Sequence, residues 1–226
     1  MSEYRAELPE VPERMRSLPI RRGYPVPWFV AMVDGDYHFP TADGRKFALA
    51  VKKRLCWVCG QPLGKSVAFV IGPMCVVNRT TSEPPCHREC AEFSAKGCPF
   101  LARPHMKRSV DVPEGATQPA GIALDRNPGA MTVWITREYF LRRVPPEVFR
   151  DSAGEERAVG GGYLFRIGAP LEVLWFSQGR AATRAEVMAS IDSGLPLLRR
   201  VAEAEEGGIE HLEEQYKRAL PLLPVA

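Results

Sequence analysis

The sequence lacks any long hydrophobic run. Its longest apolar stretch, from Val67 to Val77, is interrupted by Gly72 and Pro73, and it falls well short of the roughly 20 residues that cross a bilayer. The first residues alternate acids, bases and prolines and offer no apolar core of a secretory signal. We therefore expect a cytoplasmic protein that does not associate with membranes.

Recognisable catalytic patterns are also lacking. No Ser-His-Asp set and no carboxylate pair has a spacing that supports catalysis. Gly160-Gly161-Gly162 is not followed by the Lys-Ser/Thr pair and helix start of a phosphate-binding loop. There are only four histidines, at positions 38, 87, 105 and 211. These absences favour a non-enzymatic protein.

Cysteine is absent outside one window of the chain. All six cysteines lie within it, at positions 56, 59, 75, 86, 90 and 98. Disulfide scaffolds are typical of small secreted chains, whereas clustered cysteines in an intracellular protein indicate a metal site first. Zinc is the default candidate for that metal.

The composition itself is that of an ordinary globular protein. Of the 226 residues, 45% are hydrophobic and 25% are charged, and 21 prolines with 19 glycines favour many short elements. We predict an α+β fold, with a treble-clef-like zinc-binding N-terminal half and a C-terminal half of antiparallel strands and helices. The expected parts are a proline-rich arm (1–27), a basic zinc-binding domain (28–103), a linker (104–120) and a strand-plus-helix domain with an acidic helical tail (121–226).

Local patterns place the individual elements. Before the linker, the sequence predicts strands over 28–33 and 36–39, a hairpin of 67–71 with 74–77, and a helix over 85–96. After it, the sequence predicts strands over 130–136, 163–167 and 171–176, with an irregular connection through 144–162. Thr183-Arg-Ala-Glu186 matches a capping box for a helix that ends near Gly194, Pro196 can open a second helix, and 209–219 carries the apolar stripe of a third.

Two short ligand pairs make up the predicted metal site. Cys56-Trp-Val-Cys59 has the spacing that lets two thiolates face one ion, and Gly60 permits the tight turn after it. His87-Arg-Glu-Cys90 places two further ligands three residues apart, on one face of the predicted helix. The sequence therefore predicts a zinc ion held by Cys56, Cys59, His87 and Cys90.

The order of a thiolate knuckle, a hairpin and a ligand-bearing helix resembles the treble-clef class of zinc fingers. The Cys-x2-Cys…His-x2-Cys pattern is similar to one half of a LIM-type module, although no second set of four ligands follows. The resemblance covers roughly residues 54–100. The segments FVIGPMC and EPPCHREC also resemble stretches of uncharacterised bacterial and phage proteins, which imply no activity.

The ligand assignment leaves alternatives open. Cys86 would share the helix face of Cys90, so helical geometry does not choose between Cys86 and His87, although the two-residue spacing favours His87. Cys98 follows the helix and is a weaker candidate, and Cys75 fits a buried free thiol. Reduced core cysteines without metal are the remaining alternative. A closed site of three thiolates and one imidazole would leave no position for water, so the zinc would be structural.

The segment around the cysteines is strongly basic. Between positions 45 and 108 there are twelve Lys or Arg residues against three acids, whereas thirteen bases and seventeen acids follow position 110. A cationic surface of this kind can neutralise the phosphates of DNA or RNA. The candidate nucleic-acid-binding residues are Lys52, Lys53, Arg54, Arg79, Arg88, Lys107 and Arg108.

Two other functions compete with nucleic-acid binding. A protein-binding adaptor or inhibitor is favoured by the acidic tail and by Tyr24 and Trp28 in the proline-rich arm, residue types that often anchor interfaces. A His-Asn-His nuclease would use a treble-clef fold, but Asn78 alone supplies too little of that motif. Asp34, Asp36 and His38 alternate and could hold a metal on a strand, although ordinary turn residues explain them better.

Overall fold

The computed structural model describes residues 4–104, 106–107, 126–145, 147–150, 156–159 and 162–225. Within these ranges the protein is a mixed α+β structure with six α-helices and several antiparallel sheets, which confirms the predicted class. Most of the predicted linker 104–120 lies outside the described residues, so the division into domains stays a prediction. Among the described helices, none has both the length and the apolar character of a membrane span.

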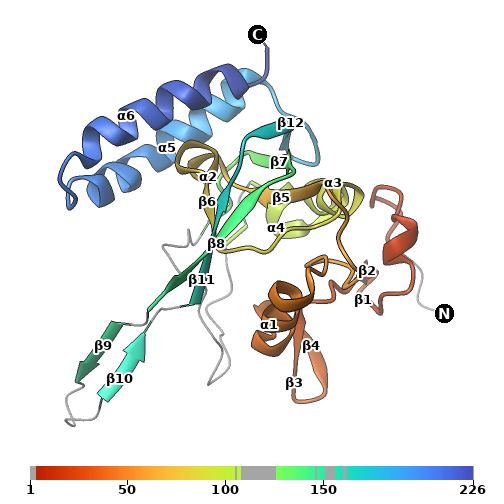
Figure 1. The fold of residues 1–226 in the computed structure, drawn as a ribbon. Helices are drawn as coiled ribbons and strands as arrows, with labels where there is room; N and C mark the ends of the chain where they lie inside the picture. The colour runs from red at the N-terminus through yellow and green to blue at the C-terminus, as the bar shows by residue number, and fades with distance from the viewer. Residues whose placement is uncertain are drawn as a thin grey trace.

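A four-stranded antiparallel sheet lies at the centre of the fold (Figure 1). Its strands, in spatial order, are β13 (Arg180–Ala181), β12 (Pro170–Ser177), β7 (Met131–Thr136) and β5 (Val67–Ile71). The pairing of β5 with β7 joins segments from the predicted N-terminal and C-terminal regions into one sheet. Every residue of β7 is buried, which requires that both faces of the sheet are covered.

Alternation along the strands divides the buried side chains between two cores. On β7, Trp134 belongs to one core, whereas Val133 and Ile135 belong to the other. On β5, Phe69 belongs to the same core as Trp134, whereas Ala68 belongs to the same core as Val133. We call these the helix-side core and the thiol-side core, after the elements that cover each face.

Three helices cover the helix-side core (Figure 1). They are α2 (Pro73–Asn78), α5 (Arg184–Ala202) and α6 (Gly208–Ala219), followed by the 3-10 turn η2 (Leu220–Leu222). The predicted capping box at the start of α5 is confirmed, because the Thr183 hydroxyl accepts from the Glu186 amide while the Glu186 carboxylate accepts from the Thr183 amide at 2.8 Å. The predicted third helix is confirmed as α6, whose Leu212 and Ala219 are buried.

The prediction of a strand over 74–77 is wrong, because this segment forms α2. Gly72 is the N-cap and Pro73 occupies the first turn of the helix, where its missing N–H costs nothing. Val76 and Val77 are buried among residues of α5 and α6. These β-branched residues therefore adopt a helical conformation because it packs them against two helices, although their residue type favours strands.

The predicted helix end near Gly194 is also wrong, since α5 continues through Gly194 and Pro196 to Ala202. A Cβ atom at Gly194 would lie 2.5 Å from the Met74 sulfur. The glycine therefore allows α2 to approach α5 closely, and it does not end the helix.

Helix α3 (Arg88–Gly97) packs on the opposite, thiol-side face, and it belongs to a series of short elements. In chain order they are η1 (Glu13–Met15), β1 (Ile20–Arg21), β2 (Tyr24–Pro25), β3 (Val30–Val33), β4 (Asp36–Ala42), α1 (Gly44–Lys53), α3 (Arg88–Gly97) and α4 (Pro99–Ala102). The predicted strands over 28–33 and 36–39 pair as β3 and β4, and Met32 of β3 is 60% exposed. The helix predicted from Pro85 begins only at Arg88.

A second sheet carries a two-stranded extension. Its strands are β6 (Thr80–Thr81), β11 (Gly162–Ile167) and β8 (Tyr139–Val144), and beyond them lies a hairpin of β9 (Glu147–Arg150) with β10 (Glu156–Val159). Figure 1 shows this hairpin projecting away from the helices. The irregular connection predicted for 144–162 is therefore wrong, because it contains paired strands.

Candidate metal centre

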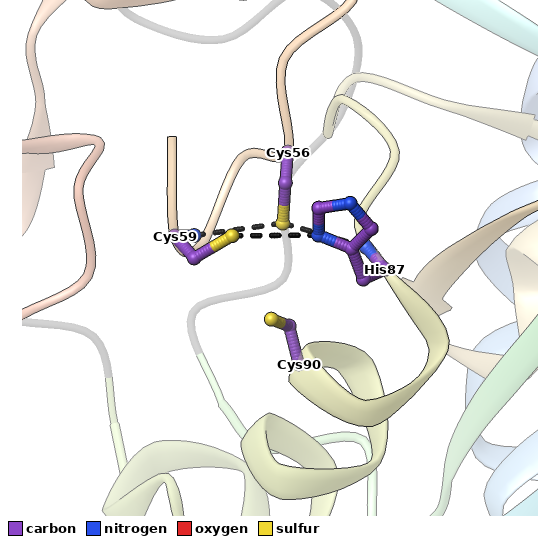
Figure 2. A group of neighbouring side chains, drawn as sticks. All are labelled: Cys56, Cys59, His87 and Cys90. Carbon is purple, nitrogen blue, oxygen red and sulfur yellow. Dashed lines mark hydrogen bonds between the residues drawn. The ribbon is translucent and has the colours of Figure 1, made fainter. Parts of the chain in front are cut away.

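Four buried side chains converge between the Cys56–Cys59 loop and the start of α3 (Figure 2). Cys56 and Cys90 are fully buried, and Cys59 and His87 are each 8% exposed. One donor atom from each residue lies within 4.8 Å of all the others. A tetrahedral ion with Zn–S bonds of about 2.3 Å would have donor atoms about 3.7 Å apart. The group could therefore hold a metal ion after a small contraction.

The backbone around the first cysteine pair forms a tight loop that aims both thiols inward. The Gly60 amide donates to the Cys56 carbonyl at 2.8 Å, and the Cys59 amide donates to the Cys56 sulfur at 3.5 Å. Gly60 has a φ of +74°, and a Cβ atom there would lie 2.7 Å from the Trp28 ring. Only glycine satisfies both the left-handed backbone and this close approach, which explains the residue after the pair.

The second pair is presented by the first turn of α3. His87 is the N-cap residue of the helix, and Cys90 lies one turn later. The His87 Nδ1 atom lies 3.4 Å from the Cys59 sulfur, while Nε2 donates to the Pro62 carbonyl at 3.0 Å. This outer hydrogen bond fixes the tautomer and leaves the Nδ1 lone pair directed at the thiols, as is typical of histidine metal ligands.

The thiols are coupled through hydrogen bonds that focus negative charge on one sulfur. Hydrogen bonds from the thiols of Cys59, Cys86 and Cys90 lower the pKa of Cys56, and the His87 amide also donates to its sulfur at 3.4 Å. The hydrogen bond to Cys56 raises the pKa of Cys90 in turn. A cluster with one stabilised thiolate suits a cation, because a bound metal deprotonates the remaining thiols.

Cys86 contributes a fourth thiol beside the three of the cluster but lies outside the four-residue group. Its thiol donates to the Pro84 carbonyl at 3.9 Å, and its backbone pairs with Ala68. Its pKa is raised by the hydrogen bond to Cys56 and by burial. Between the two candidates that helical geometry left open, the structure therefore brings His87 into the cluster.

The remaining two cysteines lie apart from the cluster. Burial raises the pKa of Cys75 on α2 to about 11 and also raises the pKa of Cys98. Both therefore stay protonated thiols at neutral pH. The sequence-based interpretation of Cys75 as a free thiol agrees with this placement, although the residue is half-buried rather than buried.

The proline-rich arm contributes residues that no local pattern identifies. Arg14 donates to the Glu89 carboxylate and, at 3.3 Å, to Gln61. The Glu89 hydrogen bond raises the pKa of Arg14, with smaller contributions from Cys59 and Cys90. A positive charge thus lies beside the donor cluster. Sequence reasoning missed this residue because a single arginine between prolines carries no spacing signal.

The predicted nucleic-acid-binding residues are distributed over several surfaces. Lys52, Lys53 and Arg54 lie together and exposed at the C-terminal end of α1. Arg88 is held by Glu92 at 2.8 Å and by both carboxylate oxygens of Glu172. Lys107 pairs with Arg126 through the backbone. Arg108 lies outside the described residues.

Arg79 lies against the helix-side core. Its guanidinium carbon is 5.3 Å from the centre of the Trp134 ring. Burial lowers the pKa of Arg79, and repulsion from Arg218 and Arg166 lowers it further. The structure therefore gathers three of the seven predicted residues on α1 and places the others elsewhere.

The other candidate residues are engaged within the chain. Asp36 accepts from Arg21 at 2.9 Å, and His38 Nδ1 lies 2.8 Å from the Thr41 hydroxyl. Asn78 accepts from the Thr80 amide at 2.9 Å. In the part of the chain that the structure describes, the four-residue cluster is the one group of three or more Cys, His, Asp or Glu side chains close enough to share a metal.

Comparison with known proteins adds no family to this description. No protein-family model, no curated protein and no solved structure matches the chain. The function must therefore be argued from the site itself.

Proposed function

We propose that this chain is a non-enzymatic, zinc-stabilised protein that binds nucleic acid through a basic surface centred on the end of α1. The observation that carries the metal part is the buried set of three thiols and one imidazole. Sulfur and imidazole donors in fourfold coordination are typical of structural zinc. Such a site has no open position for water, so the ion holds the fold and activates no nucleophile.

A treble-clef-like arrangement fits the local backbone. The knuckle of Cys56 to Gly60 is followed by β5, which pairs with Cys86 through amide-to-carbonyl bonds of 2.8 and 2.7 Å with Ala68. The helix α3, which carries Cys90, comes next. The insertion of α2 and β6 between β5 and Cys86 distinguishes it from a simple hairpin, and the LIM-like ligand order is retained.

The charge at the end of α1 supports the nucleic-acid part. In the described ranges, Lys52, Lys53 and Arg54 have no carboxylate within 4 Å, in contrast with Arg88. Unpaired surface cations can exchange their counterions for phosphates at low electrostatic cost. Zinc with three thiolates carries one net negative charge, which leaves this surface basic.

Adaptor function draws less support from the same contacts. Tyr24, a candidate interface anchor, lies under the Arg5 guanidinium at 5.4 Å. Trp28, the other candidate, lies against Gly60 and packs on the thiol-side core. Both aromatic side chains therefore have partners within the chain.

Metal analysis and a salt titration test the proposal together. We expect one zinc per chain and affinity for labelled DNA that falls steeply between about 50 and 200 mM salt. Replacing Lys52, Lys53 and Arg54 with alanine should reduce the slope of log affinity against log salt by roughly three. Replacing the exposed Arg199, Arg200 and Lys217 of α5 and α6 is the matched control. Bound zinc without any salt-dependent binding would contradict the nucleic-acid part and leave the adaptor.

A further inference from the structure

A groove separates the C-terminal end of α1 from the strands β8 and β11. Its volume is about 520 Å³, within the range of small-molecule sites. On one side it is lined by α1, at Ala50, Val51 and Arg54, and by Pro84 and Pro85. On the other side it is lined by residues 137–141, which lead into and begin β8, and by Phe165 of β11. The groove lies outside the metal cluster, and the proposed structural zinc does not account for it.

Strand register shows which side chains face this groove. Directly paired residues of an antiparallel sheet share a face, and Tyr139, Leu141 and Arg143 pair with Ile167, Phe165 and Tyr163. The Phe47 ring of α1 stacks on Tyr163 at 6.0 Å. The face that contains Tyr139, Leu141 and Arg143 is therefore the one turned toward α1.

The groove combines an aromatic and aliphatic surface with guanidinium groups. The Arg54 guanidinium carbon lies 5.9 Å from the centre of the Tyr139 ring, and Leu141 is 41% exposed. Arg54 donates to the Gly64 carbonyl at 3.5 Å. In the described part of the chain, no carboxylate lies within 4 Å of Arg54, Arg137 or Arg143. The only acid among the lining residues is Glu138.

These features match the chemistry of an unpaired nucleotide. The guanidinium groups suit a phosphate diester, and the half-buried Tyr139 ring and the exposed Leu141 side chain suit the face of a base. A duplex stacks its bases on one another and hides those faces, whereas a single strand exposes them. The groove accommodates one nucleotide and is too small for a double helix.

We propose that this groove binds an unpaired nucleotide of a single-stranded nucleic acid, with its phosphate between Arg54 and Arg137 and its base against Tyr139 and Leu141. The proposal rests on the nucleic-acid-binding function and specifies its form. Lys52 and Lys53 lie beside Arg54 on the exposed end of α1, where they contact the phosphates on either side of the bound nucleotide.

Fluorescence anisotropy tests the proposal with the full-length, metal-loaded chain. The probes are a labelled oligothymidylate of about twenty nucleotides, a duplex of equal length, and unlabelled thymidine monophosphate as competitor. We expect the single strand to bind about ten times more tightly than the duplex, and the mononucleotide to compete weakly because it lacks the flanking phosphates. Equal affinity for strand and duplex would overturn the proposal, as would a mononucleotide that competes as well as an unlabelled strand.

Two variants test the groove without disturbing the core. Leu141→Glu introduces a negative charge at an exposed side chain of β8, and Leu171→Glu, at the 55% exposed Leu171 of β12, is its matched control. We expect Leu141→Glu to weaken single-strand binding about tenfold and Leu171→Glu to leave it unchanged. Arg54→Gln should weaken it by a similar factor and reduce the salt slope by about one, compared with Arg199→Gln.

The outcomes separate this proposal from the broader one. Circular dichroism and zinc content verify that each variant is folded. Salt-dependent binding that Leu141→Glu leaves unchanged would overturn the groove while keeping nucleic-acid binding. Absence of binding to every probe by the wild-type chain would overturn both.

Discussion

The two faces of the central sheet are covered in different ways. The helix-side core is packed by the long helices α5 and α6 and consists of apolar side chains such as Ile191 and Trp134. The thiol-side core is covered by short elements and contains three of the four candidate ligands, Cys56, Cys59 and Cys90. Both faces of the sheet are therefore packed by apolar side chains, and the thiol-side core contains in addition a Cys/His cluster that could hold a metal.

This difference shows what a metal site can replace. Ordering a residue costs about 1–2 kcal/mol of backbone entropy, and a short element buries little apolar surface in return. On the thiol side, β1 and β2 have two residues each, whereas α5 has nineteen. A structural zinc site contributes about 10–16 kcal/mol when its ligands fold around the ion. We therefore expect the thiol side to depend on its candidate ligands more than the helix side does.

The largest expected effect follows from removing one ligand. Cys90→Ser should lower zinc content from one per chain to none and lower the melting temperature by about 10 °C or more, because a loss of only 3 kcal/mol already shifts it by about 6–12 °C at this size. Hydrogen exchange should increase first in residues 4–63 and α3. Elemental analysis and calorimetry measure both quantities.

Cys75→Ser is the control for that substitution, since this half-buried thiol lies on α2 away from the cluster. It should retain the metal. Equal metal content in the two variants, or identical melting curves for wild type and Cys90→Ser, would show that the thiol side is stabilised by packing as well.

A smaller effect is expected from a cavity in the helix-side core. Ile191 is 1% exposed on α5, and Ile191→Ala should destabilise the protein by about 2–5 kcal/mol. Zinc content should not change, because Ile191 belongs to the helix-side core and the three ligand cysteines belong to the thiol-side core. Metal loss in this variant would indicate that the two faces unfold as one unit and would remove the contrast between them.

The smallest effect concerns the start of α5. Hydrogen bonds from Arg180 and from the Thr183 amide lower the pKa of Glu186 to about 2, from an ordinary value of 4.5. Because the folded pKa is the lower one, this contribution is present above about pH 4.5 and is lost as the pH falls toward 2. Glu186→Gln should cost about 1 kcal/mol at pH 7 and less at pH 3. Urea denaturation at the two pH values measures the difference, and a constant cost would contradict it.

The ligand set was predictable because both halves of the site are local in sequence. In each pair, Cys56 with Cys59 and His87 with Cys90, two residues separate the ligands, and this spacing allows both side chains to face one ion. The capping box at Thr183 was predictable for the same reason. The choice of His87 over Cys86 required coordinates, because both residues precede α3 and local geometry serves either.

The rest depended on contacts between distant segments. Val76 and Val77 have strand preference, yet burial against α5 and α6 makes them helical. Gly194 resembles a helix stop in the sequence, yet it lies within α5, where its missing side chain leaves room for Met74 of α2. Arg54 was predicted as a phosphate contact from its basic run, whereas its neighbour Tyr139 comes from a strand far along the chain. A local pattern carries no information on such partners.

The pairing of β5 with β7 sets an order of events during synthesis on the ribosome. All four candidate ligands are synthesised before β7, the strand that completes the centre of the sheet, because Cys90 precedes Met131 in the chain. Coordination of an ion can therefore organise the nascent segment while its future partner strand does not yet exist. The supply of metal in the cell would then affect folding of the chain during translation, before the finished molecule is exposed to any chelator.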